Sequence, residues 1–483
     1  MSPPSPTTVS HDHRWHLGCV LPRVPAISLR AGFRFAEVTV EGGRLPAELT
    51  VDSVVGVNLR TAAAAAATLR FGPDPHDPDN LVQRLSNNSW WTEAAALMSI
   101  PAGAAGRGER NGWTGDAAFA SESECFDFAT GAFFSRYLDQ VSDTCGQHGE
   151  IGAGVPNQGT SPSQLHSTSG TNDPSWSAVF PLVAFNVWKY HNGTASVARA
   201  WPWLRRYMSL LETNYSISPH TLARWGDWNP AYPEPRNPQG QGPPFTRTVS
   251  HITGAAMVVQ NHVELAEMAR AMGYLEDAER WEAMLPTLKR EYHESFFDAE
   301  SQVYGDGTPT AYATALWLGV TPPELLPTVV ENFVKQLASV QYRMVSVGFI
   351  GVRCKIVVLS RFVAVRLANP KSITISDIFE ALSMVNRTDV ALRMLHQREY
   401  PSFGWQITND MEPATSLWES YDAPTMRQCE SSSGRPQPLA RRSSDADCCC
   451  EQGWTSRAAT TTTPLPSTPC CERCWPVSTC RQE

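Results

Sequence analysis

The stretch SHITGAAMVVQNHVELAEMARAMGYLEDAERWEAMLPTLKREY, residues 250–292, indicates the fold class of this 483-residue chain. Its first part, 250–272, predicts one helix. Its second part carries apolar residues at the spacing of an amphipathic helix, namely Trp281, Met284, Leu285, Leu288 and Tyr292. Two long helical patterns in such close succession indicate helical rather than sheet architecture here.

The same helical spacing recurs on both sides of that stretch. It gives further apolar faces at Leu204, Tyr207, Met208 and Leu211, and at Leu326, Val329, Val330, Phe333 and Leu337. Single helices are also expected at about 117–141, 176–190 and 377–396. Loops rich in Gly, Pro and Asn separate them and carry most of the clusters of Trp with acidic residues. The sequence therefore predicts a large all-α domain over residues 75–426.

The N-terminal part differs in composition from the helical part. Residues 1–30 are rich in Pro and Ser and are expected to be disordered. FRFAEVTVEG (33–42) and LTVDSVVGVNL (49–59) alternate apolar and polar residues, which predicts strands of a small β segment over residues 31–70. Residues 62–80 have the composition of a linker, so we place the domain boundary near residue 75.

Two segments interrupt or end the helical pattern. Residues 354–376 are rich in Val and Ile and contain no acidic residue, so they resemble an insertion in helical surroundings. The tail 427–483 loses hydrophobic periodicity and holds eight of the twelve cysteines, and we expect it to be disordered. Its pair Cys471 and Cys474 has no second pair at zinc-site spacing and no His beside it, so no metal site is expected.

The net charge and the absence of long apolar runs limit the classes of partner that this chain is expected to bind. The formal net charge is −9, from 48 acidic and 39 basic residues, and no long Lys/Arg run is present. Nucleic acid and anionic membrane surfaces are therefore not expected partners. No secretory signal and no apolar run of about 18 residues is visible, so the sequence predicts a soluble chain and leaves its compartment open. Sixteen Trp residues on a weakly charged chain suit a sugar substrate.

The densest cluster of reactive side chains is RGERNGWTGDA, residues 107–117. A carboxylic acid that donates a proton near neutral pH needs a raised pKa, which burial against an indole and a second carboxylate both supply. Glu109, with Trp113 and Asp116 close by in sequence, meets that requirement. An equally good local interpretation is a turn with a helix-starting Asp and a surface Arg–Glu pair.

Three further motifs combine Trp with acidic residues: DPSW (173–176), RWGDWNP (224–230) and ATSLWESYD (414–422). Taken singly, each is more often a core Trp with a capping Asp. Together they offer what hydrolysis of a glycosidic bond requires, namely an acid, an opposing carboxylate and aromatic walls that exclude water. The joint pattern favours a glycosidase.

These residues also resemble a known family, the α-L-rhamnosidases of glycoside hydrolase family 78. ERNGWTGDA is similar to the family signature ERLGWTGDA, and the other similar motifs follow in family order: WWTEAAALMSIP, DPSWSAVFPLVAFNVWKYHNG, GDWNP, YGDGTPTAYATALWLG, VGFIGV, REYPSFGW and TSLWES. The resemblance covers about residues 32–426 apart from 354–376. An ordered set of motifs is far more specific than any one of them.

The resemblance implies an all-α fold, an (α/α)6 barrel preceded by a short β-sandwich remnant. It implies removal of terminal α-L-rhamnose with inversion, with Glu109 as general acid and Glu419 as general base. It also implies a set of residues that bind the sugar: Arg107, Trp113, Asp116, Trp176, Asp227 and Trp228. Asp227 is the weakest of these, because an acid in a GDW turn often only caps that turn. The implied partner is a rhamnose-containing glycoside, and no cofactor is required.

The chain departs from the family pattern at several positions. Gly103 replaces an Asp that binds the sugar, and Met344 replaces a frequent His. The family's Asn-His-His segment and last barrel helix do not follow Glu419. We hypothesise that 354–376 is translated intron and that the tail is a shifted reading frame. Coding RNA that lacks 354–376 and continues into a normal barrel end would support this, whereas transcripts faithful to the sequence would contradict it.

These departures leave two alternatives open. One is an inactive carbohydrate-binding relic that keeps Trp113, Trp176 and Trp228. The other is an inverting glycosidase of the same barrel with a different sugar, because a fold does not fix the substrate.

Overall fold

The computed structural model describes residues 60–67, 70–72, 75, 77–102, 111–156, 173–214, 223, 225–236, 246–350 and 378–422. All of them belong to one unit that spans Met1–Cys448. The predicted disordered segment 1–30, most of the predicted β segment 31–70, the predicted insertion 354–376 and the tail 427–483 lie outside the described residues. These assignments, and the domain boundary near residue 75, stay predictions.

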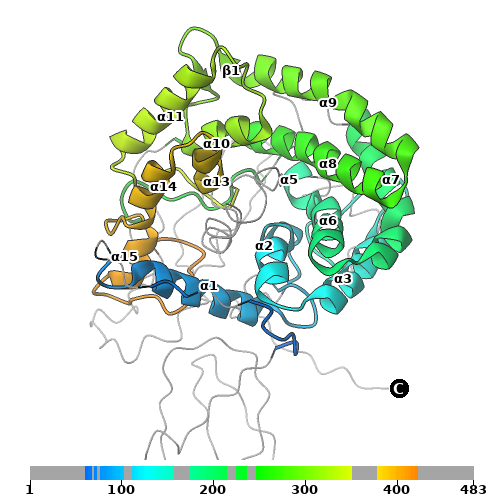
Figure 1. The fold of residues 1–483 in the computed structure, drawn as a ribbon, viewed down its shortest axis with the longest axis horizontal. Coiled ribbons are helices and arrows are strands. Elements are labelled where there is room, and N and C mark those ends of the chain that lie inside the picture. Colours follow the sequence, from blue (N-terminus) through cyan, green and yellow to red (C-terminus); the bar gives the residue numbers. More distant parts are fainter. Residues whose placement is uncertain are drawn as a thin grey trace, which may run out of the picture. The chain divides into compact units, whose positions relative to one another are not determined.

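The described helices form two concentric layers (Figure 1). The inner layer consists of α2 (Thr114–Asp127), α6 (Val179–His191), α8 (Ser250–Met272), α10 (Pro309–Leu318) and α13 (Ile378–Met384). The outer layer consists of α3 (Gly131–Thr144), α7 (Thr194–Asn214), α9 (Leu275–Phe296), α11 (Leu326–Ser339) and α14 (Thr388–Leu395). Along the inner layer each helix contacts the next, and α9, α11 and α14 each contact the inner helix that precedes them in the chain.

The layer that a helix occupies follows from its polarity. Every residue of α10 is buried, as expected for a helix of small and apolar residues that has neighbours on all sides. In α11 the buried residues are Val329, Phe333 and Leu337, a single stripe with a spacing of four. Such a stripe buries one face against the inner layer and leaves the other to solvent. The predicted apolar faces are therefore the contacts between the two layers.

Two elements complete the ring. Helices α1 (Leu81–Ala96) and α15 (Phe403–Thr408) contact each other, although they are more than 300 residues apart in sequence. Arg84 donates to the Ile407 carbonyl oxygen over 2.8 Å, and Asn88 donates to that of Ala414 over 2.9 Å. The all-α prediction is confirmed, and the described helices follow one another around a ring (Figure 1).

Two of the four expected single helices are in fact pairs. The region 117–141 contains α2 and α3, separated at Phe128, whose extended backbone ends α2. The region 377–396 contains α13 and α14, separated at Asn386, which has a positive φ of 62°. Apolar residues continue through both breaks, so periodicity alone does not reveal them. The helix predicted at 250–272 is confirmed to the residue.

Shorter elements connect the layers. α5 (Pro174–Ser177) precedes α6, and the antiparallel strands β1 (Phe297–Asp298) and β2 (Val303–Tyr304) connect α9 to α10. Part of the predicted linker, residues 62–67, is attached to the helical domain, because Ala65 bridges Phe128 in antiparallel fashion. None of the described helices is both long and apolar enough to cross a lipid bilayer.

Candidate active site

The start of α2 forms one wall of the candidate site. Trp113 precedes the helix in extended conformation and bridges Gly154, and the Thr114 N–H donates to the Ala153 carbonyl oxygen over 2.8 Å. A Cβ on Gly115 would lie 2.4–2.6 Å from indole atoms of Trp176, so only glycine lets this indole pack directly on the helix. The GWTGDA motif thus brings together two segments about 60 residues apart in sequence.

Three indoles meet beside that wall. Trp176 lies 5.8 Å from Trp225 and 6.4 Å from Trp228 between ring centroids, and Trp225 lies 5.3 Å from Trp228. Trp176 is 5% exposed, whereas Trp225 and Trp228 are partly exposed. Edge-to-face and tilted contacts of this kind hold aromatic rings in fixed relative positions. Trp176 of the DPSW motif and the indoles of Trp225 and Trp228 therefore form one aromatic cluster.

Buried carboxylates hold the loops of this cluster. Asp173 accepts from the N–H of Ser175 at the start of α5 and, over 2.7 Å, from the N–H of Trp225. Asp227 is fully buried and accepts from the Thr310 hydroxyl over 2.6 Å and from the N–H groups of Gly348 and Ile350 over 2.8 and 2.7 Å. The two loops that carry GDWNP and VGFIG are thereby tied to the start of α10.

The close packing of these loops explains a second glycine. A Cβ on Gly348 would lie 2.4 Å from the Trp228 carbonyl oxygen and 2.8 Å from Oδ1 of Asp227. The Phe349 N–H donates to the same Trp228 oxygen over 2.9 Å. Met344, ahead of this loop, is fully buried in the core. The VGFIG motif therefore helps to fix the backbone of Trp228 through close packing and one hydrogen bond.

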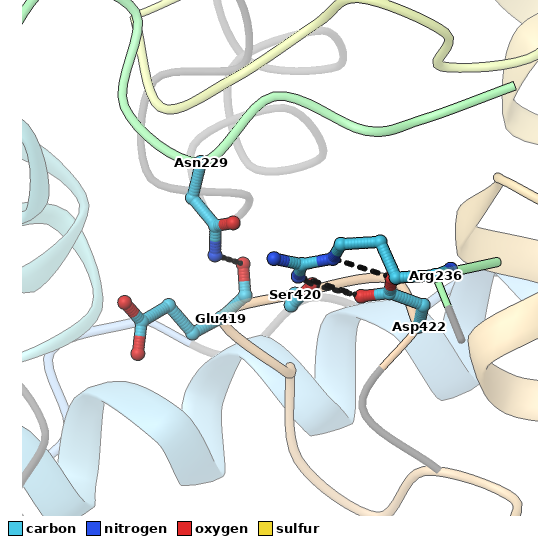
Figure 2. A network of polar contacts seen from close by, with 5 residues as sticks. All are labelled: Asn229, Arg236, Glu419, Ser420 and Asp422. Atoms are coloured by element: carbon cyan, nitrogen blue, oxygen red, sulfur yellow. Dashed lines mark hydrogen bonds and ion pairs between the residues drawn. The ribbon is translucent and has the colours of Figure 1, made fainter. Parts of the chain in front are cut away.

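The segment that carries Glu419 lies beside the same loop. The Asn229 side-chain amide donates to the backbone oxygen of Glu419 over 3.0 Å (Figure 2). Three residues later, the Asp422 carboxylate pairs with the guanidinium of Arg236, with Nε 2.7 Å from Oδ2. Burial works against the charge of Asp422, but hydrogen bonds from Arg236 and Ser420 outweigh it and hold its pKa below the usual range.

Of the residues predicted to form a site, the structure brings most of the described ones together. Trp113 and Asp116 lie at the start of α2, and Trp176 contacts both that helix and Trp228. Glu419 reaches the loop through Asn229. Arg107, Glu109 and Gly103 lie outside the described residues. The roles of these residues toward a substrate stay predictions. One of them is the contact of Asp227 with a sugar, although its carboxylate accepts three hydrogen bonds from the protein.

Several residues that organise this region were not among those predicted from the sequence. They are Asp173, Asn229, Arg236, Ser420 and Asp422. Asp173 stands before Pro-Ser-Trp, which is the pattern of a helix cap. Its hydrogen bond from the Ser175 N–H could therefore be predicted. The others bond across about 190 residues of sequence, and no local pattern announces such contacts. Among the described residues, no group of three or more His, Cys, Asp or Glu side chains is placed to hold a metal ion.

A family model now adds to this geometry. The family described as the bacterial alpha-L-rhamnosidase 6 hairpin glycosidase domain matches residues 78–369 and 373–439. This chain belongs to that family. The six-hairpin domain of the rhamnosidase family is the (α/α)6 barrel expected from the sequence, and the two concentric layers of helices are its hairpins.

Relatives within the rhamnosidase family are distant. The alpha-L-rhamnosidase of Streptomyces avermitilis is 22% identical over 392 residues, which are 81% of this chain and 32% of that protein. The alpha-L-rhamnosidase of Alteromonas sp. is 23% identical over 342 residues, covering 70% of this chain and 33% of that protein. The chain thus spans about a third of the length of these curated relatives.

Solved structures show the same fold. The crystal structure of the Streptomyces avermitilis alpha-L-rhamnosidase, complexed with L-rhamnose, aligns with a TM-score of 0.60 at 20% identity, over 75% of this chain and 30% of that one. The alpha-L-rhamnosidase from Dictyoglumus thermophilum aligns with a TM-score of 0.57 at 20% identity, over 75% of this chain and 36% of that one. These likenesses concern the fold, that is, the architecture of the barrel.

Proposed function

We propose that this chain removes terminal α-L-rhamnose from rhamnosides with inversion at the anomeric carbon. Support comes first from its family and from relatives named alpha-L-rhamnosidase. The observation that carries the proposal is the position of the Glu419 segment against the loop of the aromatic cluster, through the bond from Asn229. A carboxylate beside an indole-lined loop is what acid–base hydrolysis of a sugar needs.

The proposed mechanism uses two carboxyl groups. Glu109, as a protonated acid, gives its proton to the glycosidic oxygen as the bond to the anomeric carbon breaks. Glu419, as a carboxylate, takes a proton from the water that attacks the opposite face of the ring. Inversion of this kind places the two carboxyl groups about 6.5–9.5 Å apart, with the water between base and sugar. Asp116 accepts from sugar hydroxyls, and Trp176 and Trp228 exclude other water.

The first test is hydrolysis of p-nitrophenyl α-L-rhamnoside by the purified chain, beside Glu109→Gln and Glu419→Gln. General acid–base groups contribute roughly 100- to 10,000-fold, so we expect a loss of that order for Glu419→Gln. We expect a smaller loss for Glu109→Gln on this substrate, because p-nitrophenolate leaves with little help from an acid. NMR of the first product should show the inverted anomer. A panel of other p-nitrophenyl glycosides tests the sugar.

A second substrate separates the two roles. An alkyl rhamnoside has a poor leaving group that needs the proton of the acid, whereas p-nitrophenolate leaves with little help. Glu109→Gln should therefore lose more activity on the alkyl rhamnoside, and Glu419→Gln should lose the same factor on both. Folded chain that binds L-rhamnose and turns over none of these substrates would overturn the enzyme proposal and favour the carbohydrate-binding relic.

A further inference from the structure

Two segments separated by about 190 residues are joined beside Glu419 (Figure 2). On one side are Asn229 and Arg236, and on the other are Ser420 and Asp422. Arg236 donates from Nε to Oδ2 of Asp422 over 2.7 Å, and from Nη2 to Oδ1 of Asp422 over 2.9 Å and to the Ser420 hydroxyl over 2.7 Å. The backbone N–H of Arg236 also donates to Oδ2 over 3.0 Å. Asp422 therefore accepts from both the side chain and the backbone of one residue.

The environment of this pair makes it specific for arginine. The side chains of Arg236 and Asp422 are 14% and 1% exposed, and the guanidinium carbon lies 5.2 Å from the ring centroid of Tyr232. A planar fork bonds both carboxylate oxygens while it contacts an aromatic ring, and an ammonium group on a flexible stem cannot reproduce that geometry. Breaking such a buried pair by removing one partner leaves the other charge without compensation.

Two bonds of this cluster hold the chain at Glu419 and at the residue that follows it. Asn229 holds the backbone oxygen of Glu419, and Arg236 holds the side chain of the next residue, Ser420. The Ser420 hydroxyl in turn donates to Asp422. In Figure 2 the Glu419 side chain extends away from the Arg236–Asp422 pair. The chain from the Glu419 carbonyl to Asp422 is thus held by hydrogen bonds, while the Glu419 side chain is directed away from them.

We propose that Arg236 is a positioning residue. Through Ser420 and Asp422 it orients the Glu419 carboxylate toward the water that attacks the sugar. This rests on the proposed role of Glu419 as general base. A base must stand within hydrogen-bond reach of the water it activates, and a misplacement of about 1 Å costs about 100-fold in rate. Arg236 acts through the peptide segment 419–422.

The kinetic test compares Arg236→Met with Arg236→Lys and with a matched control. Arg343 provides the control, because its Nη1 donates to the Pro233 and Tyr400 carbonyl oxygens and so ties the same loop, 229–236, to a different segment. On p-nitrophenyl α-L-rhamnoside we expect Arg236→Met to lower kcat by about 10- to 100-fold with KM changed less than about threefold. Arg343→Met should keep kcat within about threefold of the wild type.

Three variants test how the loss arises. Added guanidinium ion at low, non-denaturing concentration should restore part of kcat in Arg236→Met, and sodium chloride at the same ionic strength should not. Arg236→Lys should retain a kcat between those of wild type and Arg236→Met, since a lysine keeps the charge and loses the fork. Asp422→Asn breaks the pair from its other side with little change of volume, and it decides the question if Arg236→Met does not fold.

Hydrogen exchange of the peptide that contains residues 416–422 tests the clamp without any substrate. We expect exchange there to accelerate about tenfold or more in Arg236→Met and Asp422→Asn and to stay unchanged in Arg343→Met. Unchanged exchange in both, or equal kinetic losses in Arg236→Met and Arg343→Met, would overturn the inference. Wild-type chain without turnover of any rhamnoside, but with the expected exchange pattern, overturns the proposed function and leaves the clamp of this segment supported.

Discussion

The two ends of α2 both carry acidic residues, in opposite surroundings. At the N-terminal end, Asp116 is partly exposed, and it follows Gly115, which packs on the indole of Trp176. At the C-terminal end, Glu124 is fully buried, and its carboxyl oxygens have no hydrogen-bond partner among the described residues. The two positions are separated by about 12 Å of helix, at 1.5 Å per residue.

Burial dominates the chemistry of the C-terminal end. It raises the pKa of Glu124 from 4.5 to about 8 and that of the neighbouring Asp127 from 3.8 to about 6. Glu93 on α1 is also fully buried, and burial, followed by the charges of Asp127 and Glu124, raises its pKa as well. Carboxylates at the C-terminus of a helix are further disfavoured by the helix dipole.

Strongly raised pKa values are often used to find catalytic acids. In this molecule the carboxyl groups with raised pKa values, Glu93, Glu124 and Asp127, lie where α1 contacts α2. The cluster of indoles lies at the other end of α2. Desolvation alone raises a pKa wherever a carboxyl group is buried, whether or not a substrate comes near. A raised pKa therefore identifies a functional site only together with an opening and groups that bind a ligand.

The largest expected effect is on activity, after one carboxyl group at each end of α2 is replaced by its amide. We expect Asp116→Asn to lower kcat/KM on p-nitrophenyl α-L-rhamnoside by about 10- to 100-fold, because a charged hydrogen bond to a sugar hydroxyl contributes about 1.5–3 kcal/mol. Glu124→Gln should change kcat/KM less than about twofold. A larger loss in Glu124→Gln than in Asp116→Asn would contradict this expectation and place the functional carboxyl group at the C-terminal end of α2.

Packing at the N-terminal end can be tested with a single methyl group. Gly115→Ala places a Cβ within 2.6 Å of the Trp176 indole, so we expect a loss of about 1–3 kcal/mol in the free energy of unfolding. Gly154→Ala is the matched control near the same end of α2, since its Cβ would meet no atom closer than 3.8 Å. Urea denaturation measures both, and equal stability of the two variants would contradict the close contact between α2 and Trp176.

The smallest expected effect is a pH dependence at the C-terminal end. The folded chain keeps Glu124 protonated up to about pH 8, whereas the unfolded chain releases that proton near pH 4.5. Between these values the folded state binds more protons, so stability falls as pH rises. Glu124→Gln removes this titration and should raise the Tm at pH 8 by about 2–6 °C relative to wild type, with a smaller difference at pH 5.

Scanning calorimetry at several pH values checks that expectation, because the difference between variant and wild type isolates one group from the other carboxyl groups. A difference in Tm that stays constant from pH 5 to pH 8 would show that the proton of Glu124 is not linked to folding. Asp139→Asn, at an exposed surface pair with Arg199, gives the reference for a carboxylate at the surface.

The helical layers could be predicted because they follow from periodicity. A stripe such as Val329, Phe333 and Leu337 defines the face that an outer helix buries, and it is visible in the sequence. The breaks at Phe128 and Asn386 could not be predicted in the same way, since apolar residues continue through both. Each break coincides with a non-helical backbone conformation, extended at Phe128 and with positive φ at Asn386.

The candidate site could be predicted in part for a similar reason. Indoles next to acidic residues mark their own motifs, so Trp176, Trp228 and Glu419 were recognisable. Arg236 and Asp422 were not, because each gains its role only when the chain brings two distant loops together. Asp227 was chosen from its motif, and the structure gives its carboxylate three bonds to the protein. The motifs therefore indicated which residues lie in this region, but they did not indicate which groups those residues bond.

The contact between α1 and residues 403–417 has a consequence for synthesis on the ribosome. Asn88 and Thr92 find their partners, Ala414 and Leu417, more than 320 residues later. At about 5–20 residues per second, the partners follow roughly 15–65 seconds after α1 is made. During that interval the face of α1 that contacts residues 403–417 is uncovered in the nascent chain and is accessible to chaperones. The first helix of the ring is therefore among the last to be completed.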